Sequence, residues 1–155
     1  MADKDTAKID FGNIIKSSVA KQKLLTIQII NFVAPRQTSE DTVYSIVCFL
    51  IAYKKEKDLD IHLLVKDLES GDTMVAEIPS WTCESIQHTS RVNQFKNVEE
   101  WFHLNVGIPT PYFTYLKQPI KINLVGVGFF DFLHGQKGML KNGREIHPVL
   151  KIEKY

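Results

Sequence analysis

Histidine and carboxylate side chains gather near the end of the chain, on both sides of a glycine-containing loop. Asp131 and His134 follow one apolar segment, while Glu145 and His147 begin the next. If these segments pair as neighbouring strands, the ends of the loop over residues 133–144 lie together and the four side chains are close. Two histidines and two carboxylates could bind a divalent metal ion or form a catalytic acid/base pair. Alternatively, they could form a polar network that anchors a long loop.

A second group consists of Asp60, His62 and Glu77. A hairpin closed between Asp67 and Asp72 aligns the apolar faces of its two strands, and this register places His62 opposite Glu77. Asp60, two residues before His62, then lies on the same face. We expect this group on the outer surface of the sheet. It could hold a metal ion or raise the pKa of the histidine for general base catalysis, or it could be an ordinary exposed cross-strand pair.

Five predicted strands and one predicted helix position these side chains. Alternating or two-sided apolar patterns predict strands over residues 42–53, 61–66, 73–78, 119–130 and 145–154, and a helical pattern covers residues 84–104. The order β-β-β-α-β-β is that of the oligonucleotide/oligosaccharide-binding (OB) fold, a five-stranded Greek-key barrel. The sequence therefore predicts a mainly β protein with an OB-like barrel; an up-and-down barrel or an α+β roll fits the pattern less well.

Two details of the last strands predict close packing between them. Gly126 and Gly128 share one face of their strand, which lets another backbone approach closely. Pro148 lacks the N–H that a strand residue donates, which predicts an edge or a bulge. Ile146, Leu150 and Ile152 are expected to turn inward.

The N-terminal segment is expected to form an extension to the barrel. Apolar residues at helical spacing predict an amphipathic helix within residues 1–23, followed by an apolar segment that could be a strand or the end of this helix. We therefore divide the chain into an extension over residues 1–35 and an OB-like domain over residues 36–155. The helix could serve as a contact surface for a homo-oligomer.

Composition excludes some classes of function and lowers the expectation for others. The 155 residues carry 19 basic and 18 acidic side chains, for a net charge of +1, whereas proteins that bind by neutralising phosphates are usually more basic. Nucleic-acid binding thus has only weak support. Neither a membrane span nor a secretory signal is evident, so we expect a cytoplasmic protein in which Cys48 and Cys83 are more often free thiols than a disulfide.

Several blocks of the sequence resemble a group of functionally uncharacterised bacterial proteins. The specific block is GVGFFDFLHGQKG at residues 126–138 with NGREIHPVL at residues 142–150; weaker matches are TVYS at 42–45, DIHLLV at 60–65 and TMVAEIP at 73–79 with Cys83. The chain departs from the group around Asp60, where the group usually has a small residue before it and a tyrosine after it. The resemblance implies the same fold and supplies no function.

The leading hypothesis is a non-enzymatic binding module for a nucleic acid, another polymer or a protein. Its ligand would dock beside the loop between the last two strands, at residues Phe129, Asp131, His134, Gln136, Lys137, Asn142, Arg144 and His147. One alternative is a metal-dependent hydrolase that uses Asp131, His134, Glu145 and His147, with a divalent metal ion as its cofactor. Another is a structural or assembly protein.

Overall fold

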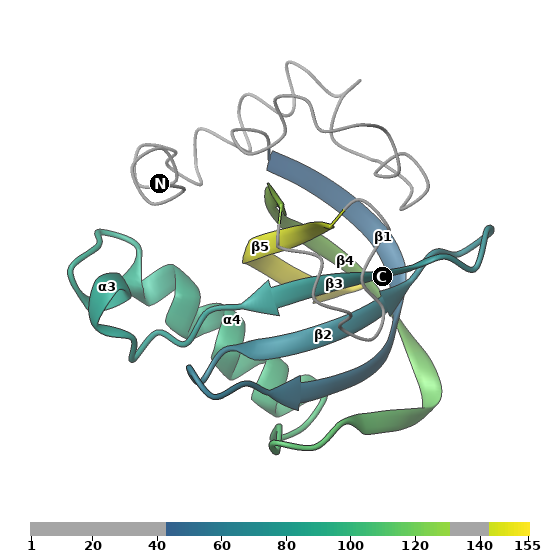
Figure 1. The fold of residues 1–155 in the computed structure, drawn as a ribbon, viewed down its shortest axis with the longest axis horizontal. Helices are drawn as coiled ribbons and strands as arrows, with labels where there is room; N and C mark the ends of the chain where they lie inside the picture. Colours follow the sequence, from purple (N-terminus) through teal and green to yellow (C-terminus); the bar gives the residue numbers. More distant parts are fainter. Residues whose placement is uncertain (1–42, 131–142) are drawn as a thin grey trace.

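A computed structural model of the chain describes residues 43–130 and 143–155, which fold into a mainly β domain with two helices (Figure 1). The elements are β1 (Val43–Lys55), β2 (Ile61–Lys66), β3 (Thr73–Ile78), α3 (Glu84–Gln87), α4 (Val92–Asn105), β4 (Thr114–Phe130) and β5 (Arg144–Lys154). The predicted mainly β class and the five strands are confirmed. The predicted N-terminal helix and extension lie outside the described residues.

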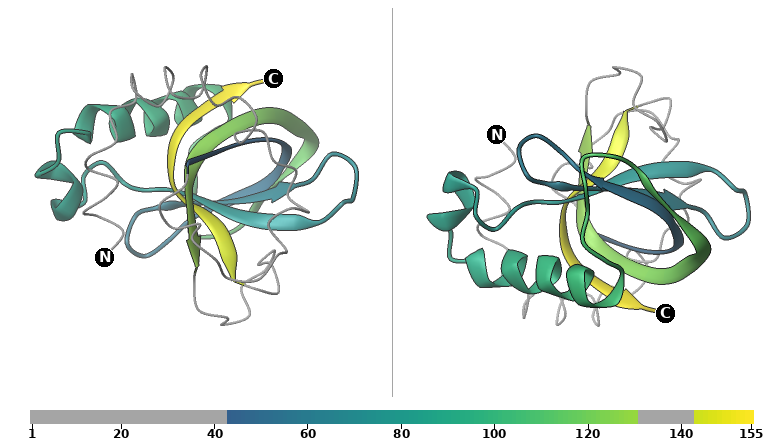
Figure 2. Two further views of the ribbon diagram at one scale, coloured as in Figure 1. Left: turned by 90° about the horizontal axis from the view of Figure 1, so that it is seen from above. Right: turned by 90° about the horizontal axis from the view of Figure 1, so that it is seen from below.

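The five strands form a closed ring in the order β1-β2-β3-β5-β4 (Figure 2). Neighbours in the ring are antiparallel except β3 and β5, which run parallel and meet at Ala76 and Ile146. This parallel contact requires a crossover between β3 and β4, and α3 and α4 lie within that connection.

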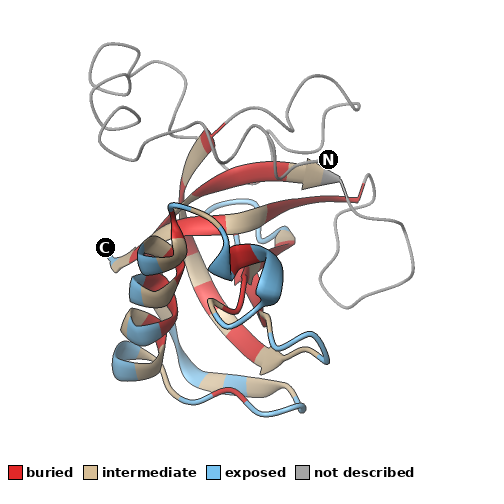
Figure 3. Cartoon of the chain, turned by 90° about the vertical axis from the view of Figure 1, so that its left-hand side faces the viewer, coloured by how far each residue is buried: buried red, intermediate tan, exposed pale blue. Residues whose placement is uncertain are grey.

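The apolar core fills the ring and continues under α4. Inside the ring, fully buried side chains come from every strand, among them Ile46, Leu63, Met74, Ile122 and Ile146. Phe102 of α4 joins this core, with its ring 5.1 Å from that of Tyr53 in an edge-to-face contact. A second cluster joins the helices to the outside of the ring through Val43, Ile86, Phe95, Val127 and Leu150. Strand β1 buries one face completely, with Ile46, Cys48 and Leu50 in the core, whereas Val47, Phe49 and Ile51 on its other face are only partly buried, although its apolar sequence indicated cover on both faces. Helix α4 is exposed only on its outer side (Figure 3).

The β2–β3 hairpin has the predicted register. Lys66 pairs with Thr73, Leu64 with Val75, and His62 with Glu77. The Asp67 side chain stabilises the turn because its Oδ1 accepts hydrogen bonds from the backbone N–H groups of Glu69 and Ser70, each at 2.8 Å.

Two predicted element boundaries were wrong. Strand β1 continues to Lys55 rather than ending at residue 53, so the turn into β2 comprises residues 56–60. Strand β4 begins at Thr114 rather than Pro119. The β1–β4 register jumps from Leu50–Ile120 to Ala52–Tyr115, so Pro119 has no paired residue on β1. Proline is tolerated at this position because no hydrogen bond to β1 is required of its backbone nitrogen.

The single helix predicted over residues 84–104 is two helices. They are separated by residues 88–91, where the Thr89 hydroxyl donates to the carbonyl of Ile86 and accepts from the N–H of Arg91. These local hydrogen bonds compete with those of a continuous helix.

Strand β5 is irregular at Pro148, as predicted, and this changes which residues face inward. Its register on β4 shifts on both sides of Val149, which pairs with Gly126. Val149 joins the core inside the ring, whereas Leu150 packs in the cluster under the helices. The expectation that Leu150 faces the interior of the ring was therefore wrong.

Both cysteines are free thiols, Cys48 buried and Cys83 exposed. Burial, together with the negative charge of Asp67, raises the pKa of Cys48 to about 12, so this thiol stays protonated and unreactive at neutral pH. Within the described ranges, neither helix is long and apolar enough to cross a membrane.

Candidate functional site

Glu145 and His147 of the first predicted group meet the second group, Asp60, His62 and Glu77, on the outer face of β2, β3 and β5. Ala76 and Ile146 are paired across the parallel β3–β5 contact, and both point into the core. Because side chains alternate along a strand, the next residues, Glu77 and His147, both point outward and lie side by side. His62 reaches the same place from β2, opposite Glu77.

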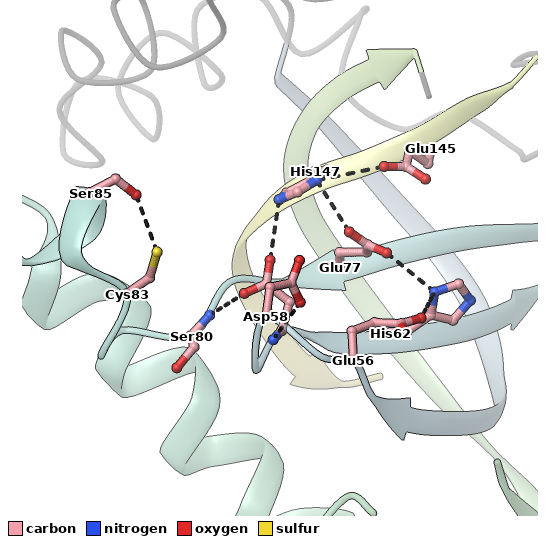
Figure 4. A network of polar contacts seen from close by, with 10 residues as sticks. Glu56, Asp58, His62, Glu77, Ser80, Cys83, Ser85, Glu145 and His147 are labelled. Atoms are coloured by element: carbon pink, nitrogen blue, oxygen red, sulfur yellow. Dashed lines mark hydrogen bonds and ion pairs between the residues drawn. The ribbon is translucent and has the colours of Figure 1, made fainter. Parts of the chain in front are cut away.

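Glu77 lies between the two histidine rings and contacts each with a different oxygen (Figure 4). Its Oε1 is 3.2 Å from Nδ1 of His62, and its Oε2 is 3.3 Å from Nδ1 of His147. The carboxylate therefore links what the sequence indicated as two separate groups into one cluster.

Asp60 and Glu145 complete the surroundings of His147. Asp60 Oδ2 is 3.7 Å from Nε2 of His147, on the side of the ring opposite Glu77, and Glu145 Oε1 is 3.6 Å from Nδ1. The other oxygen of Asp60, Oδ1, accepts a 2.8 Å hydrogen bond from the backbone N–H of Ser80. This bond fixes the carboxylate so that Oδ2 faces the imidazole.

Glu56, in the turn that leads to β2, contacts His62 from the other side of the cluster. Its Oε1 is 3.3 Å from Nδ1 of His62 and 2.7 Å from the Lys54 ammonium. The His62 ring is 1% exposed, and its Nε2 has no hydrogen-bond partner within the described part of the chain.

Two phenylalanine rings flank the cluster. Phe113 packs edge-to-face on His62 with ring centroids 5.6 Å apart, and Phe129 meets His147 at the same distance. Our expectation that His62 lies exposed on the surface was therefore wrong: it is on the outer face, but the segment that leads into β4 covers it. Glu145 also points outward and is nevertheless buried. His147 is 30% exposed and remains accessible from solvent.

The cluster changes the protonation of two of its members. Burial raises the pKa of Asp60 to about 6; the Ser80 N–H and His147 oppose this shift, and Asp58 and Glu77 add to it. For His147, burial lowers the pKa, but the hydrogen bond to Glu145 and the charges of Glu77, Glu145 and Asp60 outweigh burial and raise it. The pKa of each group therefore lies above its ordinary value.

These shifts predict how stability depends on pH in the metal-free protein. The pKa of Asp60 is higher in the folded protein than the 3.8 of an ordinary aspartate, so its ionisation destabilises the fold as the pH rises through about 6. We expect Asp60→Asn to stabilise the chain by roughly 3 kcal/mol at pH 8 and by only about 1 kcal/mol at pH 4.5, because the effect develops between the ordinary and the raised pKa and 1 pKa unit corresponds to about 1.4 kcal/mol. Urea unfolding in EDTA at both pH values measures this; a variant that is no more stable than the wild type at pH 8 would contradict the assignment.

The structure describes about half of the residues predicted to form the site. Glu145 and His147 lie in the cluster, Phe129 packs on His147, and Arg144 is buried at the start of β5. Asp131, His134, Gln136, Lys137 and Asn142 lie outside the described residues, so the predicted four-residue group that includes His134 remains untested.

Glu56 is the residue of this cluster that the sequence analysis missed. It stands in a run of mixed charges, Lys54–Asp58, which is typical of a solvated turn. Glu56 and His62 lie six residues apart on the two sides of a tight β1–β2 turn, and that hairpin geometry is the one indication in the sequence that could have paired them.

Among the residues that the structure describes, two sets of three side chains have ligand atoms close enough to share a metal ion. These are Asp60, Glu77 and His147, and Glu56, His62 and Glu77; within each set the ligand atoms lie within 4.8 Å of one another. Imidazole nitrogen and carboxylate oxygen together are a donor set that suits divalent transition metals. Comparison of the chain with protein-family models and with curated proteins gives no match.

Proposed function

We propose that this chain is an OB-type binding module that holds a divalent transition-metal ion at Asp60, Glu77 and His147. The strand order, the parallel β3–β5 contact and the helix between β3 and β4 support the OB-type assignment. In OB folds the face of β2 and β3, together with the β1–β2 loop, binds ligands. His62, Glu77 and Asp60 occupy the corresponding positions here.

This proposal is based on the different contacts of the two oxygens in each carboxylate: one oxygen contacts a protein donor, and the other faces His147. Asp60 uses Oδ1 for the Ser80 N–H, and Glu77 uses Oε1 for His62. The remaining oxygens, Asp60 Oδ2 and Glu77 Oε2, both face the His147 ring. Metal sites are commonly built in this way, with one oxygen oriented by a protein donor and the other left for the ion.

Glu145 has a supporting role in this arrangement. If His147 binds the ion through Nε2, which faces Asp60, its Nδ1–H is left to donate toward Glu145. A carboxylate behind a metal-binding histidine fixes the tautomer and makes the ligand nitrogen more basic. One histidine and two carboxylates favour zinc or manganese over the harder magnesium ion.

Isothermal titration of the full chain with Zn²⁺ and, separately, Mn²⁺ tests the proposal. We expect binding by the wild type that His147→Ala weakens by at least about 10-fold, the lower range for loss of a supporting residue. The matched control is His103→Ala, which removes another histidine that pairs with a glutamate, on α4. Equal binding by both variants would show that the metal is not held at His147.

The acidity of the cluster argues against direct binding of a nucleic-acid backbone there. Glu56, Asp58 and Glu77 repel phosphates, and Lys54, which is paired to Glu56, is the cation closest to them among the contacts described above. A single-stranded ligand therefore needs the metal ion to neutralise this face.

A metal-dependent hydrolase is the second candidate. The observation that favours it is the small number of ligands: three side chains, one of them 30% exposed, leave coordination positions for water and substrate. Zinc- or manganese-dependent cleavage of an activated phosphodiester or ester, lost in His147→Ala, would support it. Absence of turnover by the fully metal-loaded wild type on both substrates would leave only the binding function.

A further inference from the structure

The second set of ligands lies directly beside the first and shares Glu77 with it. Glu77 turns Oε2 toward His147 and Oε1 toward His62, where Glu56 supplies another carboxylate oxygen. We propose that Glu56, His62 and Glu77 hold a second divalent metal ion, so that the Glu77 carboxylate bridges two ions. This inference rests on the proposed site at His147 and extends it to a two-metal centre, in which ions are typically about 3.5–4 Å apart.

Hydrogen bonding alone leaves His62 poorly satisfied. Nδ1 faces two carboxylate oxygens at 3.2 and 3.3 Å, but an imidazole nitrogen carries one hydrogen and donates one good bond. Nε2, on the other side of this 1%-exposed ring, has no hydrogen-bond partner within the described ranges. A metal ion at Nδ1 would instead be attracted by both carboxylates and the nitrogen lone pair together.

The charges of the cluster lead to the same conclusion. The four carboxylates that contact the two histidines, on Glu56, Asp60, Glu77 and Glu145, contribute −4 with neutral histidines; Lys54, paired with Glu56 from a 23% exposed position, is not counted. One divalent ion would leave −2 in a partly buried site, where like charges repel strongly. Two divalent ions neutralise it.

The Lys54 ammonium supplies the positive charge beside Glu56 that the second ion would supply when bound. Its ammonium is 2.7 Å from Glu56 Oε1, and this side chain is 23% exposed, so it can turn toward solvent when an ion binds. The Phe113 ring, whose centroid is 5.1 Å from the ammonium, packs edge-to-face on His62 and covers it.

Native mass spectrometry of the full chain with increasing Zn²⁺ counts the ions. We expect two zinc ions on the wild type and on the control Glu100→Gln, which alters an exposed glutamate on α4. Glu56→Gln and His62→Ala should each keep one zinc, and His147→Ala should also keep one. Because His62 is buried and its variant could unfold, Glu56→Gln, whose side chain is 26% exposed, provides the independent test. Mn²⁺ should show the exchange-coupled electron paramagnetic resonance spectrum of a pair in the wild type and the six-line spectrum of a single ion in Glu56→Gln.

The outcomes separate this inference from the proposed function. A single zinc on the wild type that persists in Glu56→Gln and disappears in His147→Ala overturns the second ion and leaves the first site intact. A single zinc that disappears in Glu56→Gln and persists in His147→Ala overturns both the two-metal centre and the site at His147. Absence of zinc from the wild type overturns both proposals.

Discussion

Replacing Glu77 with glutamine is expected to abolish metal binding more completely than any other single substitution in the cluster. Its two carboxylate oxygens face different histidines, so one substitution weakens both proposed ligand sets. The amide keeps the size of the side chain and one oxygen but loses the negative charge. We expect the zinc affinity to fall by at least about 100-fold, the upper range measured for residues that only support a ligand.

Fluorescence competition with a zinc chelator, at a pH where both histidines are neutral, measures this affinity. Glu100→Gln is the matched control because it removes the same charge from an exposed pair with Lys96 on α4. Circular dichroism should show that Glu77→Gln is folded, since Glu77 lies outside the apolar core inside the ring. Retention of wild-type affinity by a folded Glu77→Gln protein would contradict the proposed site.

The second large expected effect is on stability, at Gly126 in β4. A methyl group added there would collide with Cγ2 of Ile146 and lie 2.6 Å from the carbonyl oxygen of Pro148 and 3.2 Å from Cα of Val149. Two of these atoms belong to the backbone of β5, which is held in the ring between β4 and β3 and cannot move without breaking strand pairing. Overpacking of this kind typically costs about 1–3 kcal/mol, and the collision with backbone places Gly126→Ala at the upper end.

Urea unfolding of Gly126→Ala measures the loss of stability. A gain of about 0.4–1 kcal/mol from the less flexible unfolded chain opposes the collision, so a net loss of roughly 2 kcal/mol is expected. Because His147 and Pro148 lie in the same irregular part of β5, zinc affinity should fall as well. A variant as stable as the wild type would show that β5 does not pack against Gly126 as described.

The features predicted correctly from the sequence are those that local patterns determine. The register of the β2–β3 hairpin follows from the alternation around its turn, because a slip by one residue would turn every apolar side chain outward. The close approach at Gly126 and the irregularity at Pro148 follow from residue types with distinct backbone properties. The mainly β class follows from the number of such segments.

The features that the sequence did not reveal depend on contacts between distant segments. Glu77 and His147 are 70 residues apart in numbering, and the parallel β3–β5 ladder that brings them together has one paired position, Ala76 with Ile146. The burial of His62 depends on Phe113, which lies between the helix predicted over residues 84–104 and the strand predicted over residues 119–130. The break between α3 and α4 depends on hydrogen bonds of Thr89 that an apolar pattern does not report.

Anomalous diffraction from crystals of the full chain grown with Zn²⁺ tests the central claim most directly. We expect an anomalous-difference peak bonded to Asp60, Glu77 and His147, with zinc at about 2.0–2.2 Å from their oxygen and nitrogen atoms. Peaks confined to histidines elsewhere, such as His103 on α4, with none between Asp60 and His147, would contradict it.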